Sequence, residues 1–368
     1  MPAGPDTDAR DLALDALRGL AVVLMLLVNV AAALDGAPAW LMHRPWDGLG
    51  LADAVFPLFL TVSGTVLGRA VSNGRQGPRG RTARLLRRTV WLALLGVLLG
   101  ALPLGAWDES GEWQRLALGD LRLPGVLQRI ALCGALASAL AAAGRAVAWA
   151  ACAVVLVAYP LALAALAPHG DVQAAVAALD ASVFGVRHLL ETDGQRFDPE
   201  GLVSTPAATV TVLLGALTAG WSRAPRALAG LSLVAAGLLV SPVVALNKPL
   251  WSSSYVLVTS GVAFLLHAAA GGLAATAARP LLRFLAVPGR QALFLYVLSE
   301  AAEALLGVVR VGDGSALDAL VRPGLDLGLD PAAASVAGAL AWLAVLLGVA
   351  FVRQRIRNAA GLSGRGPR

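Results

Sequence analysis

The sequence HRPWDGLGLADAVFPLFL, residues 43–60, places one imidazole and two carboxylates directly before a long apolar run. That run, predicted over residues 51–71, is long enough to cross the hydrocarbon core of a bilayer as a helix. Ionisable residues at the mouth of a membrane span are costly and typically serve binding or chemistry. His43 is of particular interest, because a histidine side chain takes up and releases protons near neutral pH.

The composition of the chain is that of an integral membrane protein. Hydrophobic residues make up 58% of the 368 residues, and charged residues only 14%. Soluble proteins have far more charged residues and fewer apolar ones. We predict an all-α, polytopic fold with about ten transmembrane helices, at residues 17–34, 51–71, 88–105, 123–143, 146–167, 203–221, 227–246, 251–271, 289–309 and 332–352.

The charges of the loops predict the orientation of these spans. Arginine-rich loops, around residues 69–88, 223–226, 279–290 and 353–357, alternate with acidic loops around 108–112, 171–200 and 313–330. Basic residues collect on the cytoplasmic side of membrane proteins. We therefore predict a multi-pass protein of the cell membrane with both termini in the cytoplasm and His43 at the outer side. The acidic residues before the first span argue against a cleaved signal.

One domain over residues 1–357 and a disordered tail over 358–368 are predicted. The stretch 168–202 is expected to form an outer cap. The net charge of +6 does not indicate a nucleic-acid partner, because the arginines lie between spans and form no basic stripe interleaved with aromatic residues. Cys133 and Cys152 both lie in apolar spans, so neither a disulfide nor a metal site is expected.

Asn29, His43 and Asp53 form the predicted catalytic group. An Asp that accepts a hydrogen bond from one imidazole nitrogen fixes the tautomer and leaves the other nitrogen as a base. Asp53 can do this for His43, and Asn29 can orient the ring or stabilise an oxyanion. The structural alternative is an interfacial His43 beside Trp46, with Asp53 as the N-cap of the following helix.

Several other polar residues are candidates for holding a substrate. Arg129 lies inside an apolar span and needs a partner, either an acidic residue such as Asp53 or Glu300, or a bound anion. Lys248 is the sole lysine beside 28 arginines, and its compact ammonium either serves the site or snorkels to the interface. The turn at residues 197–201 either caps the next helix or covers a site.

Five ordered blocks of the sequence together resemble a known family. They are Leu14-Asp15-Ala-Leu-Arg18-Gly19 with Asn29; the stretch from His43 through Trp46 and Asp53 to Pro57; Pro124-Gly-Val-Leu-Gln128-Arg129; Asp198-Pro-Glu200-Gly201; and Asn247-Lys248-Pro-Leu-Trp251 with Tyr255. This order resembles the heparan-α-glucosaminide N-acetyltransferase family, in a bacterial-type form without the extra amino-terminal domain. One departure is Ser299 before Glu300, where family members often carry His.

The resemblance implies a transmembrane acyltransferase. Such an enzyme takes an acetyl group from cytosolic acetyl-CoA and delivers it to an amino sugar or related glycan on the extracytoplasmic side. The active-site His, Asn and Asp of the family fall on His43, Asn29 and Asp53. We expect acetyl-CoA as the acyl donor, no metal, and compatibility with a homodimer. Residues expected to contact acetyl-CoA or the acceptor are Trp46, Arg84, Arg88, Gln128, Arg129, Lys248 and Glu300.

The sequence leaves the mechanism and two other classes of function open. His43 is expected either to deprotonate the acceptor or to carry the acetyl group as an acetyl-imidazole. A proton-coupled transporter or flippase of a sugar or lipid-linked sugar could also use a central His, Asp and Arg. Broken helices or internal repeats, which are typical of transporters, are not detected in the sequence. A scaffold would not require Arg129 and Glu300 within spans.

Overall fold

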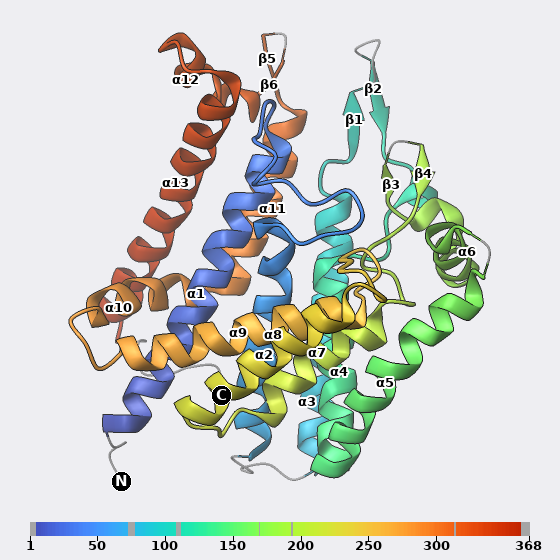
Figure 1. Ribbon diagram of the computed structural model, residues 1–368. Helices are drawn as coiled ribbons and strands as arrows, with labels where there is room; N and C mark the ends of the chain where they lie inside the picture. Colours follow the sequence, from blue (N-terminus) through green and yellow to red (C-terminus); the bar gives the residue numbers. More distant parts are fainter. Residues whose placement is uncertain are drawn as a thin grey trace. The chain divides into compact units, whose positions relative to one another are not determined.

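The computed structural model describes residues 5–72, 78–107, 112–168, 170–192, 194–312 and 314–361. These residues form α-helices joined by loops, three two-stranded antiparallel hairpins and three short 3-10 helices (Figure 1). The prediction of an all-α fold is confirmed. The chain divides into two compact units, and whether they act as one domain, as predicted, is not tested by this division.

Unit 1 comprises residues 1–43, 50–56 and 266–368. Its helices are α1 (Pro5–Ala33), α10 (Arg279–Gly289), α11 (Ala292–Val308), α12 (Arg322–Asp326) and α13 (Pro331–Ala359), with the hairpin β5 (Arg310–Val311) and β6 (Gly314–Ser315) and the 3-10 helix Asp318–Leu320. Helix α10 lies across the amino-terminal half of α1 (Figure 1). A Cβ atom on Gly19 would lie 1.7 Å from the Leu285 carbonyl oxygen, so this crossing requires glycine.

An apolar cluster in unit 1 holds the loop that carries His43. Leu34 directly follows α1, Leu41 lies within the loop, and Ala52 lies just after it. All three are buried in one cluster with Ala334 and Ala339 of α13. Because Leu41 and Ala52 are 1% and 2% exposed, the chain is anchored on both sides of His43. Burial of these apolar groups stabilises the loop geometry.

Unit 2 comprises residues 44–49 and 57–265. Its helices are most of α2 (Leu51–Ser72), α3 (Pro78–Ala101), α4 (Val126–Ala143), α5 (Arg145–Leu166), α6 (Val172–Phe184), α7 (Thr205–Leu217), α8 (Arg223–Val240) and the first part of α9 (Ser253–Leu273), with hairpins β1 (Gly105–Trp107)–β2 (Trp113–Arg115) and β3 (Glu191–Thr192)–β4 (Gln195–Arg196) and 3-10 helices Leu118–Asp120 and Val186–His188. Helix α4 packs against α3, α5 and α7.

Helices α2 and α7 approach each other through glycines. A Cβ atom on Gly64 would lie 2.0 Å from the Val212 carbonyl oxygen, and one on Gly215 would lie 2.0 Å from the Thr61 carbonyl oxygen. Small residues allow this kind of close backbone contact between membrane helices. The two helices therefore have no room for larger side chains at these positions.

The prediction of ten spans is supported only in part. Among the described residues, seven helices are long and apolar enough to cross a membrane, or eight if α10 and α11, which meet at 61°, form one broken span. Each predicted segment contains a helix, but α3 carries Arg84, Arg87 and Arg88 near its middle, and α7 has only 13 residues. The orientation of the termini stays a prediction.

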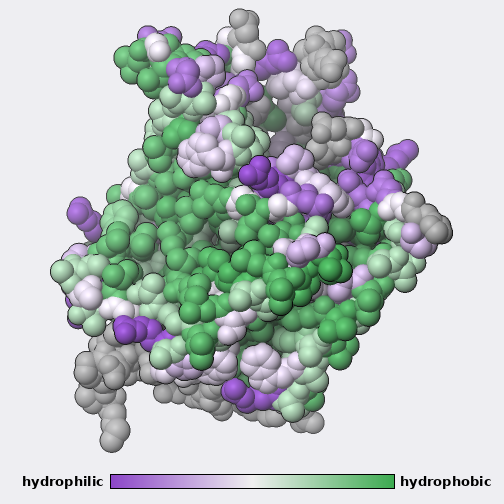
Figure 2. Space-filling model, in the orientation of Figure 1, coloured by the Kyte–Doolittle hydropathy of each residue, from purple (hydrophilic) through white to green (hydrophobic). Residues whose placement is uncertain are grey.

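Large apolar side chains lie exposed on several of the long helices. Examples are Leu228, Leu231, Leu238 and Leu239 on α8. Figure 2 shows hydrophobic side chains, in green, covering much of the visible surface of α5 and α8. Exposed apolar area of this extent is typical of a surface that meets lipid or a partner, and it fits a multi-pass membrane protein.

Two peripheral segments differ in detail from the prediction. The expected cap at residues 168–202 contains α6 and the β3–β4 hairpin, with His169 and Asp193 outside the described residues. Helix α13 continues to Ala359, two residues into the predicted disordered tail. Residues 362–368 of that tail lie outside the described part of the chain.

Candidate active site

His43 and Asp53 form a hydrogen-bonded pair within unit 1. The Nδ1 atom of His43 lies 2.9 Å from Oδ1 of Asp53. The Asp53 side chain is 1% exposed, whereas the His43 side chain is 45% exposed. An ionised carboxylate only accepts hydrogen bonds, so the pair favours the tautomer with the proton on Nδ1. In this tautomer the Nε2 atom carries no proton and is the basic nitrogen of the ring.

Asp53 also caps the helix on which it lies. Helix α2 begins at Leu51, and the Gly50 amide donates to Oδ2 of Asp53 over 2.9 Å. A carboxylate in the first turn that reaches back to the N-cap amide satisfies one unpaired donor of the helix and interacts favourably with the helix dipole. The two oxygens of Asp53 therefore have different partners: one meets His43, and the other accepts from Gly50, with Asp53 in the first turn of α2 and not at the predicted N-cap position.

Asn29 is held by a second carboxylate of unit 1. Its Nδ2 atom donates to Oε1 of Glu300 over 2.9 Å, across from α1 to α11. One turn further along α11, Glu303 accepts hydrogen bonds from the hydroxyl of Ser299 and, over 3.1 Å, from Nε1 of Trp342. Ser299, which replaces the expected histidine, thus has a hydrogen-bonding role of its own.

In unit 2, residues 46–48 are joined to the Asn247 block. The Nδ2 atom of Asn247 donates to Oδ1 of Asp47 over 3.0 Å, and the Gly48 amide donates to the Leu246 carbonyl oxygen over 2.7 Å. The Trp46 ring meets the Phe197 ring edge to face, with centroids 5.8 Å apart. Three of the sequence blocks are therefore brought together: the segment after His43, the turn at 197–201 and the Asn247–Lys248 segment.

Arg129 is buried among backbone carbonyls. Its Nη2 atom donates to the carbonyl oxygens of Pro199 and Gly201 and to Oγ of Ser204, over 2.9, 2.7 and 2.6 Å. The guanidinium group lies 5.4 Å from the centroid of the Trp251 ring. The structure thus shows Arg129 fixing the turn before α7. Its predicted role in binding acetyl-CoA stays a prediction.

Trp251 itself has an unusual backbone. Its φ of 54° lies in the left-handed region, which non-glycine residues seldom adopt. Its side chain is 1% exposed, and Nε1 donates to Oγ1 of Thr211 over 3.1 Å. The contacts of the ring with Thr211 and Arg129 hold the residue in this conformation.

Arg122 completes the same region and was missed by the sequence-based prediction. Its Nε and Nη2 atoms donate to the two oxygens of Asp198 over 2.8 and 2.7 Å, and Nη2 also donates to Glu200 over 2.7 Å. Burial opposes the charged form of Glu200, but Arg122, Arg129 and Lys248 outweigh it and hold the pKa of Glu200 below its ordinary value. The signal for Arg122 was a basic residue close to the start of an apolar span, in a loop that also carries Asp108, Glu109, Glu112 and Asp120.

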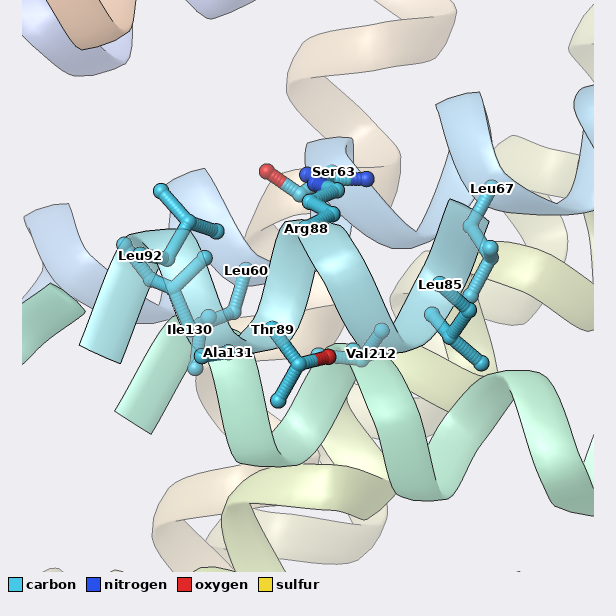
Figure 3. A pocket seen from close by; sticks show the side chains of 11 residues that line it. Leu60, Ser63, Leu67, Leu85, Arg88, Thr89, Leu92, Ile130, Ala131 and Val212 are labelled. Atoms are coloured by element: carbon cyan, nitrogen blue, oxygen red, sulfur yellow. The ribbon is translucent and has the colours of Figure 1, made fainter. Parts of the chain in front are cut away.

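The two predicted arginines of α3 lie in different surroundings. Arg88 lines a cavity between α2, α3, α4 and α7 that contains about 410 Å³ of empty space, part of it open to the outside (Figure 3). Arg84, one turn earlier, does not line this cavity, and both arginines are exposed. Gln128 packs on α3, because a Cβ atom on Gly96 would lie 2.2 Å from its Oε1 atom.

The chemistry available to these residues is acid–base chemistry at His43. Within the described residues, no group of three or more His, Cys, Asp or Glu side chains could hold a metal ion. His43 offers a half-exposed nitrogen backed by a buried carboxylate, which is the arrangement of a general base or a nucleophile. Asn29 offers an amide whose orientation is set by Glu300.

Comparison with known proteins finds a family model that is similar to part of this chain. Residues 10–177 match the family model described as heparan-alpha-glucosaminide N-acetyltransferase, catalytic. The family resemblance predicted from the sequence is confirmed. The matched residues include Asn29, His43 and Asp53, whereas Lys248 and Glu300 lie beyond them.

Two mammalian proteins are similar over a shorter stretch. The heparan-alpha-glucosaminide N-acetyltransferase of Mus musculus is 36% identical over 118 residues, which are 32% of this chain and 17% of the mouse protein. The Homo sapiens protein of the same name is 33% identical over 118 residues, 32% of this chain and 16% of the human protein. The similarity thus spans about a sixth of the length of these relatives.

Proposed function

We propose that the protein is a membrane-embedded acetyltransferase. It transfers an acetyl group from cytosolic acetyl-CoA to an amino sugar or related glycan on the extracytoplasmic side of the cell membrane, with both termini in the cytoplasm. The observation that carries this proposal is the hydrogen bond between His43 and the buried Asp53. The family match of the surrounding residues supports the reaction class.

In the proposed reaction, His43 acts as the general base. Nε2 takes a proton from the acceptor amine as the amine nitrogen attacks the thioester carbonyl, and Asp53 stabilises the imidazolium that forms. This attack forms the new C–N bond, and collapse of the tetrahedral intermediate then breaks the C–S bond. The proton on Nε2 then passes to the leaving thiolate, so that free CoA thiol and the acetamide are the products.

Asn29 is the proposed oxyanion donor. Because Glu300 occupies one N–H of the Asn29 amide, the second N–H remains for the oxygen of the tetrahedral intermediate. Removal of a donor of this kind typically lowers the rate about 10²–10³-fold. In the alternative mechanism, Nε2 attacks the thioester itself and the acetyl group resides on His43 before the acceptor binds.

The proposal is tested by acetyl-CoA turnover of purified protein in nanodiscs, with glucosamine as the acceptor. We expect acceptor-dependent thiol release by wild type and a loss of at least about 100-fold in His43→Ala. His188→Ala is a matched control, since His188 also bonds through Nδ1, to the Leu121 carbonyl oxygen over 2.7 Å, but lies outside the proposed site. Equal loss in both variants would contradict a catalytic role of His43.

One observation favours a second candidate, a transporter or flippase. Helices α10 and α11 meet at 61°, and broken spans of this kind are common in secondary transporters. If wild type releases no thiol from acetyl-CoA but moves a labelled sugar or lipid-linked sugar across a proteoliposome membrane, this second function replaces the first.

A further inference from the structure

Helix α10 has three distinct faces. Arg279 and Arg283 of the helix, and Arg290 directly after it, lie within about 40° of one another around the helix axis, and all three are exposed. Leu281 and Phe284, about 150° away around the axis, are also exposed, by 55% and 46%. The third face is buried against α1 in an apolar cluster of unit 1. The helix therefore has one exposed edge that is charged and another that is apolar.

Helix α10 meets α1 at the point where the charges of α1 end. A Cβ atom on Gly289 would lie 1.9 Å from the Asp15 carbonyl oxygen, one turn before the contact of α10 with Gly19. Arg18 is the last charged residue of α1, and residues 19–34 carry no charge. The uncharged run of α1, which is apolar enough to enter hydrocarbon, therefore starts where α10 crosses it.

Helix α13 has a similar boundary beside α10. Residues 331–352 carry no charge, and Arg353 is the first of the arginines at the end of the helix. Just before this boundary, the centroid of the Phe351 ring lies 5.0 Å from that of Phe284. At the boundary, Nη1 of Arg353 donates to Oε1 of Gln291, two residues after α10, over 3.1 Å. The uncharged run of α13 thus ends where it meets α10.

The three helices together indicate the level of the bilayer surface. Helices α1 and α13 pack along each other, and α10 lies across α1 (Figure 1). When the apolar runs of two neighbouring spans end at one level, the hydrocarbon core ends there as well. Helix α10 extends along this level, and the 61° bend before α11 turns the chain from the surface toward the bilayer.

We propose that α10 lies in the plane of the membrane surface and binds anionic phospholipid headgroups through Arg279 and Arg283. Inside the hydrocarbon, the arginine edge would lose its hydration, and in water the apolar edge would stay uncovered. At the interface, the arginines meet headgroups while Leu281 and Phe284 meet acyl chains, which is the usual arrangement of an interfacial helix. This inference is independent of the reaction proposed for His43.

The charges around α10 favour an anionic lipid over a neutral one. Among the described residues, no hydrogen bond or ion pair is found for the guanidinium groups of Arg279 and Arg283. Arg290, in contrast, is paired with Asp15 over 2.9 Å. Positions 279 and 283 are four residues apart on one helix face, so both arginines can reach the same phosphodiester. Phosphatidylglycerol supplies this group without the positive charge that a choline headgroup brings close to the arginines.

The depth of α10 is measured with a fluorescent label on its apolar edge. Leu281→Cys is labelled with bimane and reconstituted into vesicles, and Cys133 and Cys152 do not compete for the label because both are buried. Lipids that carry a nitroxide near the headgroup or near the end of the acyl chain quench shallow or deep labels. We expect stronger quenching by the shallow nitroxide at position 281. Leu340→Cys, 50% exposed near the middle of the apolar run of α13, is the control and should be quenched more by the deep nitroxide.

The preference for anionic lipid is measured with the same label. Trace amounts of nitroxide-labelled phosphatidylglycerol or phosphatidylcholine are added to a phosphatidylcholine bilayer, and the ratio of quenching gives the local enrichment. We expect phosphatidylglycerol to be enriched about 10- to 30-fold beside α10, the contribution of two arginines at a membrane surface. Arg279→Gln combined with Arg283→Gln should abolish this enrichment. The matched control, Arg279→Lys combined with Arg283→Lys, keeps the charge and should retain most of it.

Each outcome supports or overturns the inference. Shallow quenching at position 281, with an enrichment that the glutamine pair loses, supports it. Deep quenching like that of Leu340→Cys would make α10 and α11 one broken span, and quenching by neither nitroxide would place α10 in water, so either result would overturn it. An enrichment that is absent, or that persists in the glutamine pair, would show that Arg279 and Arg283 do not bind the anionic lipid.

Two checks keep this test independent of folding and of catalysis. Thermal unfolding verifies that each variant folds, and Phe284→Cys, on the same apolar edge, serves as the label site if Leu281→Cys does not fold. None of the measurements requires turnover of acetyl-CoA. Failure of the proposed acetyltransferase reaction would therefore leave the result for α10 unchanged.

Discussion

Replacing Asp53 with asparagine should separate the two tasks of this side chain. The carboxylate accepts from Nδ1 of His43 with one oxygen and from the Gly50 amide with the other, both over 2.9 Å. A carboxamide of the same shape has only one acceptor oxygen. If that oxygen stays on Gly50, the NH₂ group faces Nδ1, the ring proton moves to Nε2, and the proposed base is blocked.

If the carboxamide oxygen of the variant turns to the imidazole instead, the cost falls on the helix. The Gly50 amide then loses its partner, which destabilises the first turn of α2 by about 1 kcal/mol, the usual value of a helix cap. Removal of positioned acid–base catalysis lowers rates about 10²–10⁴-fold. We therefore expect Asp53→Asn to lower kcat/KM for acetyl-CoA by about that factor with only a small loss of thermal stability.

The assay is acceptor-dependent thiol release between about pH 6 and 9, a range that spans the ordinary histidine pKa, with Asp47→Asn as the control. Asp47 lies in the same loop, and an amide oxygen at this position can still accept from Asn247. Raising the pH should not restore the activity of Asp53→Asn. The variant loses activity because its neutral imidazole carries the proton on Nε2, and a higher pH does not change this tautomer. A kcat/KM near that of wild type, with an unchanged pH profile, would refute the role of Asp53.

Three further predictions concern folding and are followed by thermal unfolding in detergent. Gly64→Ala should unfold the protein or lower its midpoint strongly, because its Cβ would lie 2.0 Å from the Val212 carbonyl oxygen, whereas Gly134→Ala, into open space, should be neutral or stabilising. Arg129→Leu should destabilise by about 2 kcal/mol or more, since it removes three hydrogen bonds made by a buried charged group, and an unchanged midpoint would contradict this. The pKa of Glu200 is held below its ordinary value in the folded protein. Its contribution to the free energy of unfolding is therefore complete above about pH 4.3 and is lost as the pH falls through the pKa of the folded state. This acid-side loss should appear in wild type and be absent in Glu200→Gln.

The pair of His43 and Asp53 could be predicted because it is local. Ten residues separate the two side chains, and the start of a helix after a short loop limits where Asp53 can lie. The link between Asn29 and Glu300, 271 residues apart, was not predicted, since the pairing of α1 with α11 is set by packing. Sequence patterns identify each helix face but not the helix that it meets.

The hydrogen-bond partners of Arg129 could not be predicted from the sequence. A buried arginine suggests a search for a carboxylate or an anion, but the Nη2 atom of Arg129 donates to two backbone carbonyls and a serine. Any residue supplies a carbonyl, so no side-chain pattern marks the turn that receives the guanidinium. The carboxylates Asp198 and Glu200 instead pair with Arg122, which lies before α4.

The described helices support seven or eight of the ten predicted spans. Hydropathy detects an apolar stretch but does not show whether it is straight or long enough. The Pro288–Gly289 pair at the end of α10 was a sign of the bend before α11, since proline and glycine favour helix breaks. Helix α7 carries no charged residue yet ends after 13 residues.

The left-handed backbone of Trp251 restricts which sequences can occupy this position. Such a conformation costs most side chains of order 1–3 kcal/mol and glycine almost nothing. The tryptophan is retained at that cost because its indole bonds Thr211 and lies beside the Arg129 guanidinium. A change to glycine would relax the backbone while removing the ring, and a change to a β-branched residue would lose on both counts. Single substitutions of Trp251 should therefore be poorly tolerated. Where another residue stands at this position, we expect a change at Arg129 or Thr211 as well.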